Sequence, residues 1–171
     1  MNKCTINDIA LNIGSGMTPL RSNMEFWNSS DYPWLKTEQL GTFQIYDTEE
    51  YISKAAFEQT TIKLWPPKTI SVAMYGEGQT RGKVSIIMKE MTTNQACCNI
   101  VVNPDVADYR YVYYWLKNNY EQLRVLSSGV RKNLNSDDIK NFPIYVPDIP
   151  IQEQIVNVLY VLDKKIELND R

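Results

Sequence analysis

The side chains of this sequence best suited to nucleophilic or metal chemistry are three cysteines, Cys4, Cys97 and Cys98. The chain has no histidine, so it lacks the usual general base, the usual activator of a thiol and the commonest metal ligand. Gln95-Ala96-Cys97 matches a cysteine-protease signature only until Cys98 and Asn99 break the pattern. We therefore expect no catalytic residue and no metal site, and we expect Cys97 to lie in a buried strand.

Two polar segments carry side chains that can hydrogen-bond to a ligand instead. In the first, residues 76–82, three glycines surround Gln79, Thr80 and Arg81. In the second, residues 127–135, Arg131 and Lys132 place two positive charges next to each other. Loop side chains are more often simply solvated than functional, and that alternative stays open for each of them.

Rigid elements must hold these segments in place. Residues 69–75 alternate, with Ile70, Val72 and Met74 on one face, and residues 83–88 follow the first polar segment, so the pair predicts a β-hairpin. The other predicted elements are strands over 32–37, 96–102 and 144–146, a helix over 53–60 capped by Ser53, a main helix over 108–125, and a short turn over 136–140 capped by Ser136. This mixture without repeats predicts an α+β fold, with a single mixed α/β globular domain.

An amphipathic helix is predicted from Pro150 to the end of the sequence. Pro150 suits the first helical turn because its missing N–H would have no partner there. The apolar residues recur at three- and four-residue steps and are Ile151, Ile155, Val158, Leu159, Leu162 and Ile166. A helix of about 20 residues reaches roughly 30 Å, so it can protrude from the domain and offer this stripe to a partner. The alternative is an ordinary terminal helix that packs back on its own core.

Composition limits the partners of this chain. Of its 171 residues, 18 are basic and 20 acidic, and a small positive excess occurs only in the middle of the sequence. So modest an excess does not support strong nonspecific binding to nucleic acid, and DNA binding would need local contacts or a basic partner. No apolar run approaches the roughly 20 residues of a membrane span, and no signal peptide is apparent. We therefore expect a soluble cytoplasmic protein that does not contact a membrane.

Several short motifs, taken in order, resemble the target recognition domain of a type I restriction-modification specificity subunit. They are Gly14-Ser15-Gly16-Met17-Thr18-Pro19, Trp34, Tyr75-Gly76, Gly82-Lys83, Asn94-Gln95-Ala96, Tyr111-Val112-Tyr113-Tyr114-Trp115-Leu116, Gly129 with Asn133-Leu134, Ile144-Tyr145-Val146-Pro147, and Pro150 with Gln152-Glu153-Gln154-Ile155. The motifs cover nearly the whole chain. Each is weak by itself, whereas their common order is specific.

The resemblance implies a non-catalytic protein without a cofactor that reads double-stranded DNA, while methyltransferase and restriction subunits perform the chemistry. It divides the chain into a DNA target recognition domain, 1–147, and the start of a conserved spacer helix, 148–171. Family members usually hold two recognition domains, each reading half of a split target. This chain would then be a fragment, or a half-sized subunit that pairs with another recognition domain or with a second copy of itself. Self-pairing would imply a symmetric target.

The expected DNA contacts follow from side-chain chemistry, because Arg favours guanine and Asn or Gln favours adenine, whereas Lys, Ser and Thr hold phosphates. The candidates are Gln79 and Arg81 as base readers, Thr80 and Lys83 nearer the backbone, Arg131, Lys132 and Asn133 in the second polar segment, and Arg21, Lys36 and Thr37 elsewhere. The pair Asn94-Gln95 has two interpretations, a DNA contact or a turn held by side-chain amides.

Two other functions compete with this one. The acidic balance and aromatic richness of the chain also fit a protein-interaction scaffold that docks through its terminal helix. A stand-alone DNA methyltransferase would need a glycine-rich nucleotide loop and an Asn-Pro-Pro-Tyr-type segment. Asn103-Pro104-Asp105 is only a turn, so the sequence disfavours that enzyme.

Overall fold

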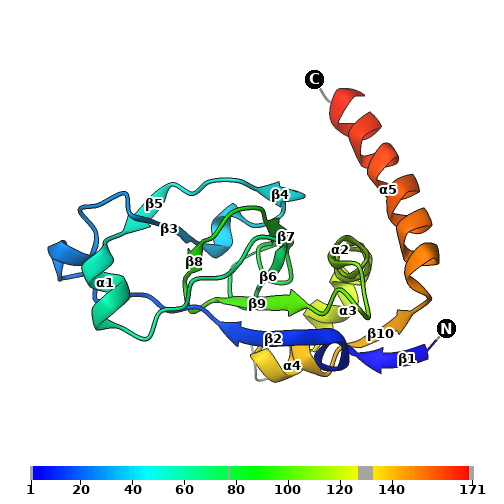
Figure 1. Cartoon of the computed structure of the whole chain (residues 1–171), viewed down its shortest axis with the longest axis horizontal. Coiled ribbons are helices and arrows are strands. Elements are labelled where there is room, and N and C mark those ends of the chain that lie inside the picture. The colour runs from blue at the N-terminus through cyan, green and yellow to red at the C-terminus, as the bar shows by residue number, and fades with distance from the viewer. Residues whose placement is uncertain (1, 77, 127–132, 170–171) are drawn as a thin grey trace.

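The protein is described here by a computed structural model that covers residues 2–76, 78–126 and 133–169. Figure 1 shows a mixed body of strands and short helices, with the helix α5 (Ile149–Asn169) rising from one edge of it. The chain therefore has the α+β fold and the protruding C-terminal helix that the sequence predicts.

A five-stranded sheet forms the centre of the body, in the order β2-β9-β6-β7-β4. Its strands are β2 (Ala10–Ser15), β9 (Cys97–Val102), β6 (Thr69–Ala73), β7 (Val84–Ile87) and β4 (Gln44–Ile45). The predicted hairpin is confirmed, because β6 and β7 pair antiparallel from Thr69 opposite Ile87 to Val72 opposite Val84. The edge strand β4 runs parallel to β7, and the other neighbours are antiparallel.

Both faces of this sheet are covered along its middle strand β6, where every residue is buried. On one face Ile70 and Val72 join the main core with residues of helix α2 (Tyr109–Asn118), such as Val112. On the other face Ala73 packs in a second cluster with Trp65. A strand buried on both sides cannot shift without disrupting two packed layers, so the sheet is a rigid support for the loops at its ends.

A smaller lobe lies at one end of the body, on the left of Figure 1. It contains η2 (Met24–Phe26), β3 (Tyr32–Leu35), η3 (Thr37–Gln39), β5 (Glu50–Ile52), α1 (Lys54–Gln59) and β8 (Thr92–Thr93), with β5, β3 and β8 forming one sheet. Ser53 caps α1 as predicted, because its hydroxyl accepts a hydrogen bond from the Ala56 N–H at 3.1 Å. The buried Trp34 anchors the lobe to the segment after β2, since its ring N–H donates to the Met17 carbonyl at 3.0 Å.

The remaining elements are β1 (Asn2–Thr5), η1 (Ile6–Ile9), α3 (Tyr120–Val125), α4 (Ser136–Lys140) and β10 (Pro143–Val146). The prediction of one helix over 108–125 is wrong, because the chain breaks between α2 and α3 at Asn119. The backbone of Asn119 has φ −99° and ψ 23°, outside the helical region, and its side-chain amide also donates to the Trp115 carbonyl at 2.8 Å. The predicted cap of α4 is also wrong by one residue, since Asn135 accepts from the N–H groups of Asp137 and Asp138 at 2.9 Å.

Cys97 is fully buried in β9, as predicted. Burial raises the pKa of its thiol to about 12, so the thiol stays protonated at neutral pH. Within the ranges described above, no group of three or more metal-binding side chains is placed to hold an ion. No helix in those ranges is long and apolar enough to cross a bilayer.

Candidate nucleic-acid interface

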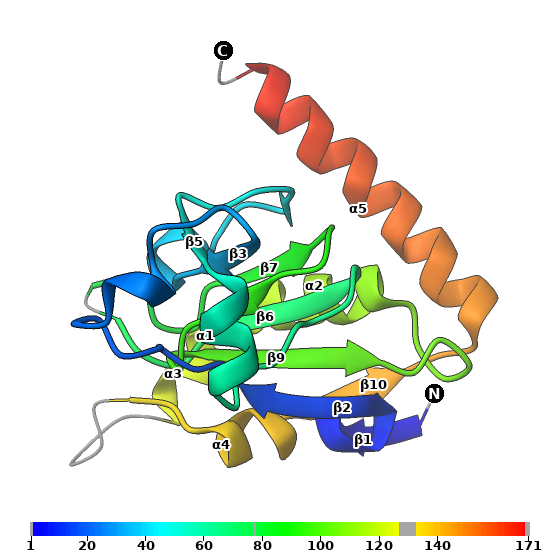
Figure 2. The same ribbon diagram turned by 60° about the vertical axis from the view of Figure 1, so that its left-hand side comes forward.

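Loops that are far apart in the sequence meet at one end of the central sheet, where β2 and β6 end and β7 and β9 begin. The Leu134 N–H donates to the Met74 carbonyl at 3.0 Å, which joins the second polar segment to the base of the hairpin. In Figure 2 the hairpin loop, the segment after β2 and helix α3 all lie on the left, whereas α5 starts on the right and rises across the top of the view. The predicted contact segments therefore converge on one side of the body, which we call the loop side (residues 16–23, 78–82 and 133–136).

Helix α3 holds the hairpin loop by its backbone. The Tyr120 hydroxyl donates to the Gln79 carbonyl at 2.5 Å, and the Arg124 guanidinium donates to the Gly78 carbonyl at 3.0 Å. A Cβ atom at Gly82 would lie 3.0 Å from the Arg124 side chain, so this position has room only for glycine while α3 stays in place. These contacts restrain the backbone of the loop and leave the Gln79 side chain exposed.

Sequence reasoning missed Tyr120 and Arg124, although a signal for them existed. The two residues are four positions apart, which places them on one face of a helix. That face does not include the buried Leu123 of α3, so its side chains are available to hold a neighbouring segment.

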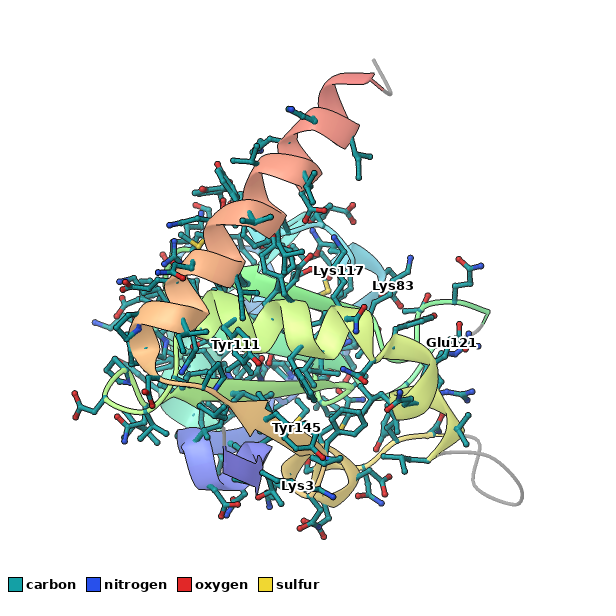
Figure 3. The ribbon with its side chains drawn as sticks, turned by 90° about the vertical axis from the view of Figure 1, so that its right-hand side faces the viewer. Lys3, Lys83, Tyr111, Lys117, Glu121 and Tyr145 are labelled. Atoms are coloured by element: carbon teal, nitrogen blue, oxygen red, sulfur yellow. The ribbon has the colours of Figure 1, made fainter. Side chains whose placement is uncertain are left out.

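The other predicted residues of the hairpin differ in exposure. Thr80 and Arg81 are half-buried, and Thr80 packs so closely on Gly76 that a Cβ atom there would lie 2.6 Å from it. Lys83 is also half-buried and lines a cavity of about 340 Å³ together with Lys117 of α2. Figure 3 shows Lys83 and Lys117 on the same side of α2. The hairpin thus presents Gln79 at its tip, while Lys83 lies back toward the main body.

The second polar segment is only partly described. Arg131 and Lys132 lie outside the described residues, whereas Asn133 is described and its side chain is exposed. The next residue, Leu134, is buried in the main core, and Asn135 caps α4. Asn133 therefore stands directly before two anchored residues, which limit where its own backbone can lie.

Arg21 and Lys36 are engaged inside the small lobe. The carboxylate of Glu50 accepts from Arg21 at 2.5 Å and from Lys36 at 2.6 Å. The Arg21 guanidinium also lies 3.7 Å from the ring centroid of Trp27. The hydrogen bond from Arg21, followed by that from Lys36, lowers the pKa of the Glu50 carboxyl. The two cations therefore stabilise the fold of the lobe, and any contact of theirs with DNA would compete with Glu50.

Two further predicted positions have clear places in the structure. Thr37 is only 4% exposed, so its side chain lies in the interior and is not available to DNA in this structure. The Asn94 amide oxygen accepts from the Ala96 N–H at 3.2 Å, which is the turn-holding role. Gln95 is exposed and accepts a hydrogen bond from the Thr18 hydroxyl. The turn-holding interpretation therefore holds for Asn94, whereas a DNA contact by Gln95 stays a prediction.

The first turns of α5 belong to the core of the body. Gln152 has no exposed surface, and its side-chain oxygen accepts from the Asp108 N–H at 2.8 Å. Its amide group donates to the carbonyls of Pro147 at 2.7 Å and Val106 at 3.3 Å. Val156, one turn later, is buried in the main core. The helix is therefore fixed at its base.

Only part of the predicted apolar stripe of α5 packs against the body. Ile155 and Leu159 pack against the main core, as the self-packing alternative expects. The other four members are exposed, with relative exposures of 47% at Ile151, 62% at Val158, 50% at Leu162 and 58% at Ile166. Further along the helix, Lys117 binds Asp163 at 3.0 Å, and the rings of Phe43 and Tyr160 lie 5.8 Å apart. The helix therefore leans on α2 with one face and leaves a second apolar face uncovered.

Comparisons with known proteins place the chain in a family. All of residues 1–171 match the family model described as the type I restriction modification DNA specificity domain. The chain is 25% identical over 162 residues to the type I restriction enzyme EcoR124I/EcoR124II specificity subunit of Escherichia coli, covering 93% of this chain and 40% of that protein. It is 29% identical over 167 residues to the MjaIX specificity subunit of Methanocaldococcus jannaschii, covering 95% of this chain and 38% of that protein.

A solved structure shares the fold. The HsdS subunit from Thermoanaerobacter tengcongensis superposes with a TM-score of 0.76 at 14% identity, over 98% of this chain and 38% of that one. The chain spans about 40% of the length of the curated relatives it matches. Because the family model covers every residue, the chain belongs to the type I restriction modification DNA specificity domain family.

Proposed function

We propose that this chain reads one half of a split DNA target for a type I restriction-modification complex, in which methyltransferase and restriction subunits carry out the chemistry. The observation that carries the proposal is the loop side, where polar segments from three parts of the sequence lie together on a rigid sheet. DNA recognition needs donors and acceptors held in a fixed arrangement, and a sheet whose middle strand is buried on both faces provides that arrangement.

Gln79 and Asn133 are the described residues with the best chemistry and exposure for base contacts. Each has a side-chain amide that can form a bidentate pair with adenine. Arg81 is the candidate for guanine, and its partial burial means that it would reach DNA with only part of its side chain. Arg131 and Lys132 remain candidates on their chemistry alone.

The uncovered face of α5 supports the proposal that the target is split and that a second recognition domain reads its other half. Ile151, Val158, Leu162 and Ile166 are too exposed to contribute to this body. A helix of about 21 residues reaches roughly 30 Å, so a partner helix lying along this face would set the distance between two recognition domains. The partner would be the spacer helix of another recognition domain or of a second copy of this chain. A second copy would produce a symmetric bipartite target.

The test is a methylation-site map of cells that express the chain together with methyltransferase subunits. The proposal expects methylation at one bipartite sequence, which Gln79→Ala and Asn133→Ala relax at single positions of one half. A lost bidentate contact costs about 1 to 3 kcal/mol, so each variant should lose most of its preference for one base.

Asn12→Ala is the matched control, since Asn12 is an exposed amide in β2 that lies outside the loop side. This variant should leave the methylated sequence unchanged. Tight association with methyltransferase subunits but no sequence-dependent methylation would contradict DNA reading and would favour a scaffold that docks through α5.

A further inference from the structure

A polar cavity lies where the central sheet meets α4 and the small lobe. It has a volume of about 510 Å³, and its lining includes the backbone of Gly14, Ser15 and Gly16 at the end of β2. Lys63 approaches it from the segment after α1, and Lys140 approaches it from the last residue of α4. Two cations from distant parts of the sequence therefore line one cavity, and neither was a predicted contact.

We propose that Lys63 and Lys140 together hold a backbone phosphate of the DNA duplex. This inference rests on the proposed function, because it names the residues that would fix the register of the chain on the DNA. Phosphate contacts position a protein on the duplex without reading sequence, and lysine ammonium groups are common donors for them. The chain carries a net charge of −2, so local cation pairs of this kind must supply the attraction that net charge does not.

The backbone beneath the cavity is held in one place. Gly16 lies so close to Thr93 that a Cβ atom there would be 2.1 Å from the Thr93 carbonyl oxygen. The Gly16 N–H donates to the Cys97 carbonyl at 3.1 Å, and the Met17 N–H donates to the Thr93 carbonyl at 2.8 Å. The chain therefore lies flat against β8 and β9, an approach that any side chain at Gly16 would prevent.

Gly14 lies beside Trp65 and the first lysine. A Cβ atom at Gly14 would lie 3.2 Å from the Trp65 ring and 3.8 Å from the Lys63 ammonium nitrogen. The ammonium group lies 5.9 Å from the centroid of the Trp65 ring. Across residues 2–76, 78–126 and 133–169, no acidic side chain lies within ion-pair distance of Lys63. Its charge is therefore available to an anion in the cavity.

The second lysine has a partner that a phosphate can replace. The Lys140 ammonium lies 3.3 Å from the Asp137 carboxylate, and the Asp137 side chain is 78% exposed. Ion pairs this exposed are weak because water and salt screen them. Ser136 joins the same cavity lining, and its hydroxyl also contacts the Met74 sulfur at 3.7 Å, so the cavity borders the loop side.

The decisive experiment is a salt titration of DNA binding by the assembled complex. Each phosphate contact contributes about 0.9 to the slope of log K against log salt concentration. The double variant Lys63→Gln/Lys140→Gln should lower that slope by about 1 and weaken binding about tenfold at low salt, equally for target and non-target DNA. Asp137→Asn should change affinity in the opposite direction, because it releases Lys140.

The charge-matched control is Lys3→Gln/Lys89→Gln. Lys3 lies on β1 and Lys89 pairs with Asp47 at 2.7 Å, so both are outside the cavity lining. A slope for the cavity variant that equals the slope of this control would overturn the inference. The proposed function would still stand if the wild-type complex bound target DNA more tightly than non-target DNA. A wild-type complex that bound both equally would overturn the proposed function itself.

Lysine acetylation gives a second, direct measurement. Acetic anhydride labelling followed by mass spectrometry should show Lys63 and Lys140 protected when DNA is bound, with Lys3 labelled equally in both states. Equal labelling of Lys63 and Lys140 with and without DNA would contradict phosphate binding in this cavity.

Discussion

The side-chain oxygen of Gln152 accepts a hydrogen bond from the backbone N–H of Asp108 at 2.8 Å. This bond joins the first turn of α5 to the residue that caps α2, although the two residues are 44 positions apart in the sequence. Gln152 belongs to the motif Gln152-Glu153-Gln154-Ile155, whose role the sequence left unexplained. The structure shows that one glutamine of this motif sets where the protruding helix begins.

Replacing Gln152 by Leu should therefore destabilise the whole chain. The change leaves the Asp108 N–H and the carbonyls of Pro147 and Val106 buried without their partner. We expect a loss of about 3 kcal/mol in the free energy of unfolding, measured by urea titration. Gln154→Leu is the control, because Gln154 is exposed on the same helix and should change stability by less than about 0.5 kcal/mol. Equal effects of the two variants would contradict this role for Gln152.

Replacing Arg124 by Met should loosen the hairpin loop without unfolding the domain. Methionine keeps apolar packing against Gly82 but removes the hydrogen bond to the Gly78 carbonyl. Hydrogen exchange measured by mass spectrometry should become faster in residues 78–82, while global stability falls by only about 1 kcal/mol. Glu121→Gln removes only the ion pair of Arg124 with Glu121 at 3.8 Å, so exchange in the loop should stay unchanged in that variant.

Charge on the uncovered face of α5 should block assembly and spare the fold. Leu162 is 50% exposed, so Leu162→Glu should change the free energy of unfolding by less than about 0.5 kcal/mol. The same variant should abolish pairing or subunit assembly, as measured by analytical ultracentrifugation, because a carboxylate would be buried in the interface. Val156→Ala is the control on the buried face of the same helix. Val156 is 1% exposed, so this variant should lower the free energy of unfolding by about 2 kcal/mol. Assembly by Leu162→Glu at wild-type strength would show that this face has no partner.

The small lobe should lose stability in acid through Glu50. Its folded pKa lies below the ordinary value of 4.5, chiefly because of the hydrogen bond from Arg21. The ionised form is thus favoured in the folded state, so its contribution is complete above pH 4.5 and is lost as the pH falls through the folded pKa. At neutral pH, Glu50→Gln should cost about 1 kcal/mol, since the side chain is partly exposed. The difference from wild type should vanish in acid.

Glu58→Gln is the control for this pH dependence. Glu58 pairs with Lys54 at 3.6 Å on the surface of α1, and its side chain is 61% exposed. At neutral pH, thermal unfolding of this variant should follow the wild type, because water and salt screen so exposed an ion pair. A stability difference between Glu50→Gln and wild type that stays constant from neutral pH into acid would contradict the linkage.

Local patterns in the sequence identified the longer helices and five of the strands, but not β1, β2, β4, β5 or β8. The alternation at Ile70 and Val72 predicts β6, and Ser53 predicts the start of α1, because each depends on neighbours within a few residues. Prediction was less accurate where a side chain competes with the backbone. Helix α2 ends before the non-helical backbone of Asn119, and Asn135 instead of Ser136 caps α4. Neither choice is specified by apolar spacing.

The candidate site was predictable only in part. Gln79 and Asn133 are exposed in loops, as their polar, glycine-rich surroundings indicate. The interior position of Thr37 and the pairing of Arg21 with Glu50 depend on how β3 and β5 pack, which the local sequence does not reveal. Lys63 and Lys140 carried no signal, because each is an isolated lysine until the tertiary fold brings them to one cavity.

The sequence by itself determined the composition of this protein, its hairpin, the strands β3, β9 and β10, and the apolar periodicity of its last helix, because these depend on residues close together in the chain. The tertiary structure alone decided which apolar residues of α5 are covered and which polar loops meet. Periodicity identifies a stripe but not the surface that will pack against it, since that choice is made by contacts such as Gln152 with Asp108 and Lys117 with Asp163. For this reason Ile155 faces the core while Leu162, on the same predicted stripe, faces outward.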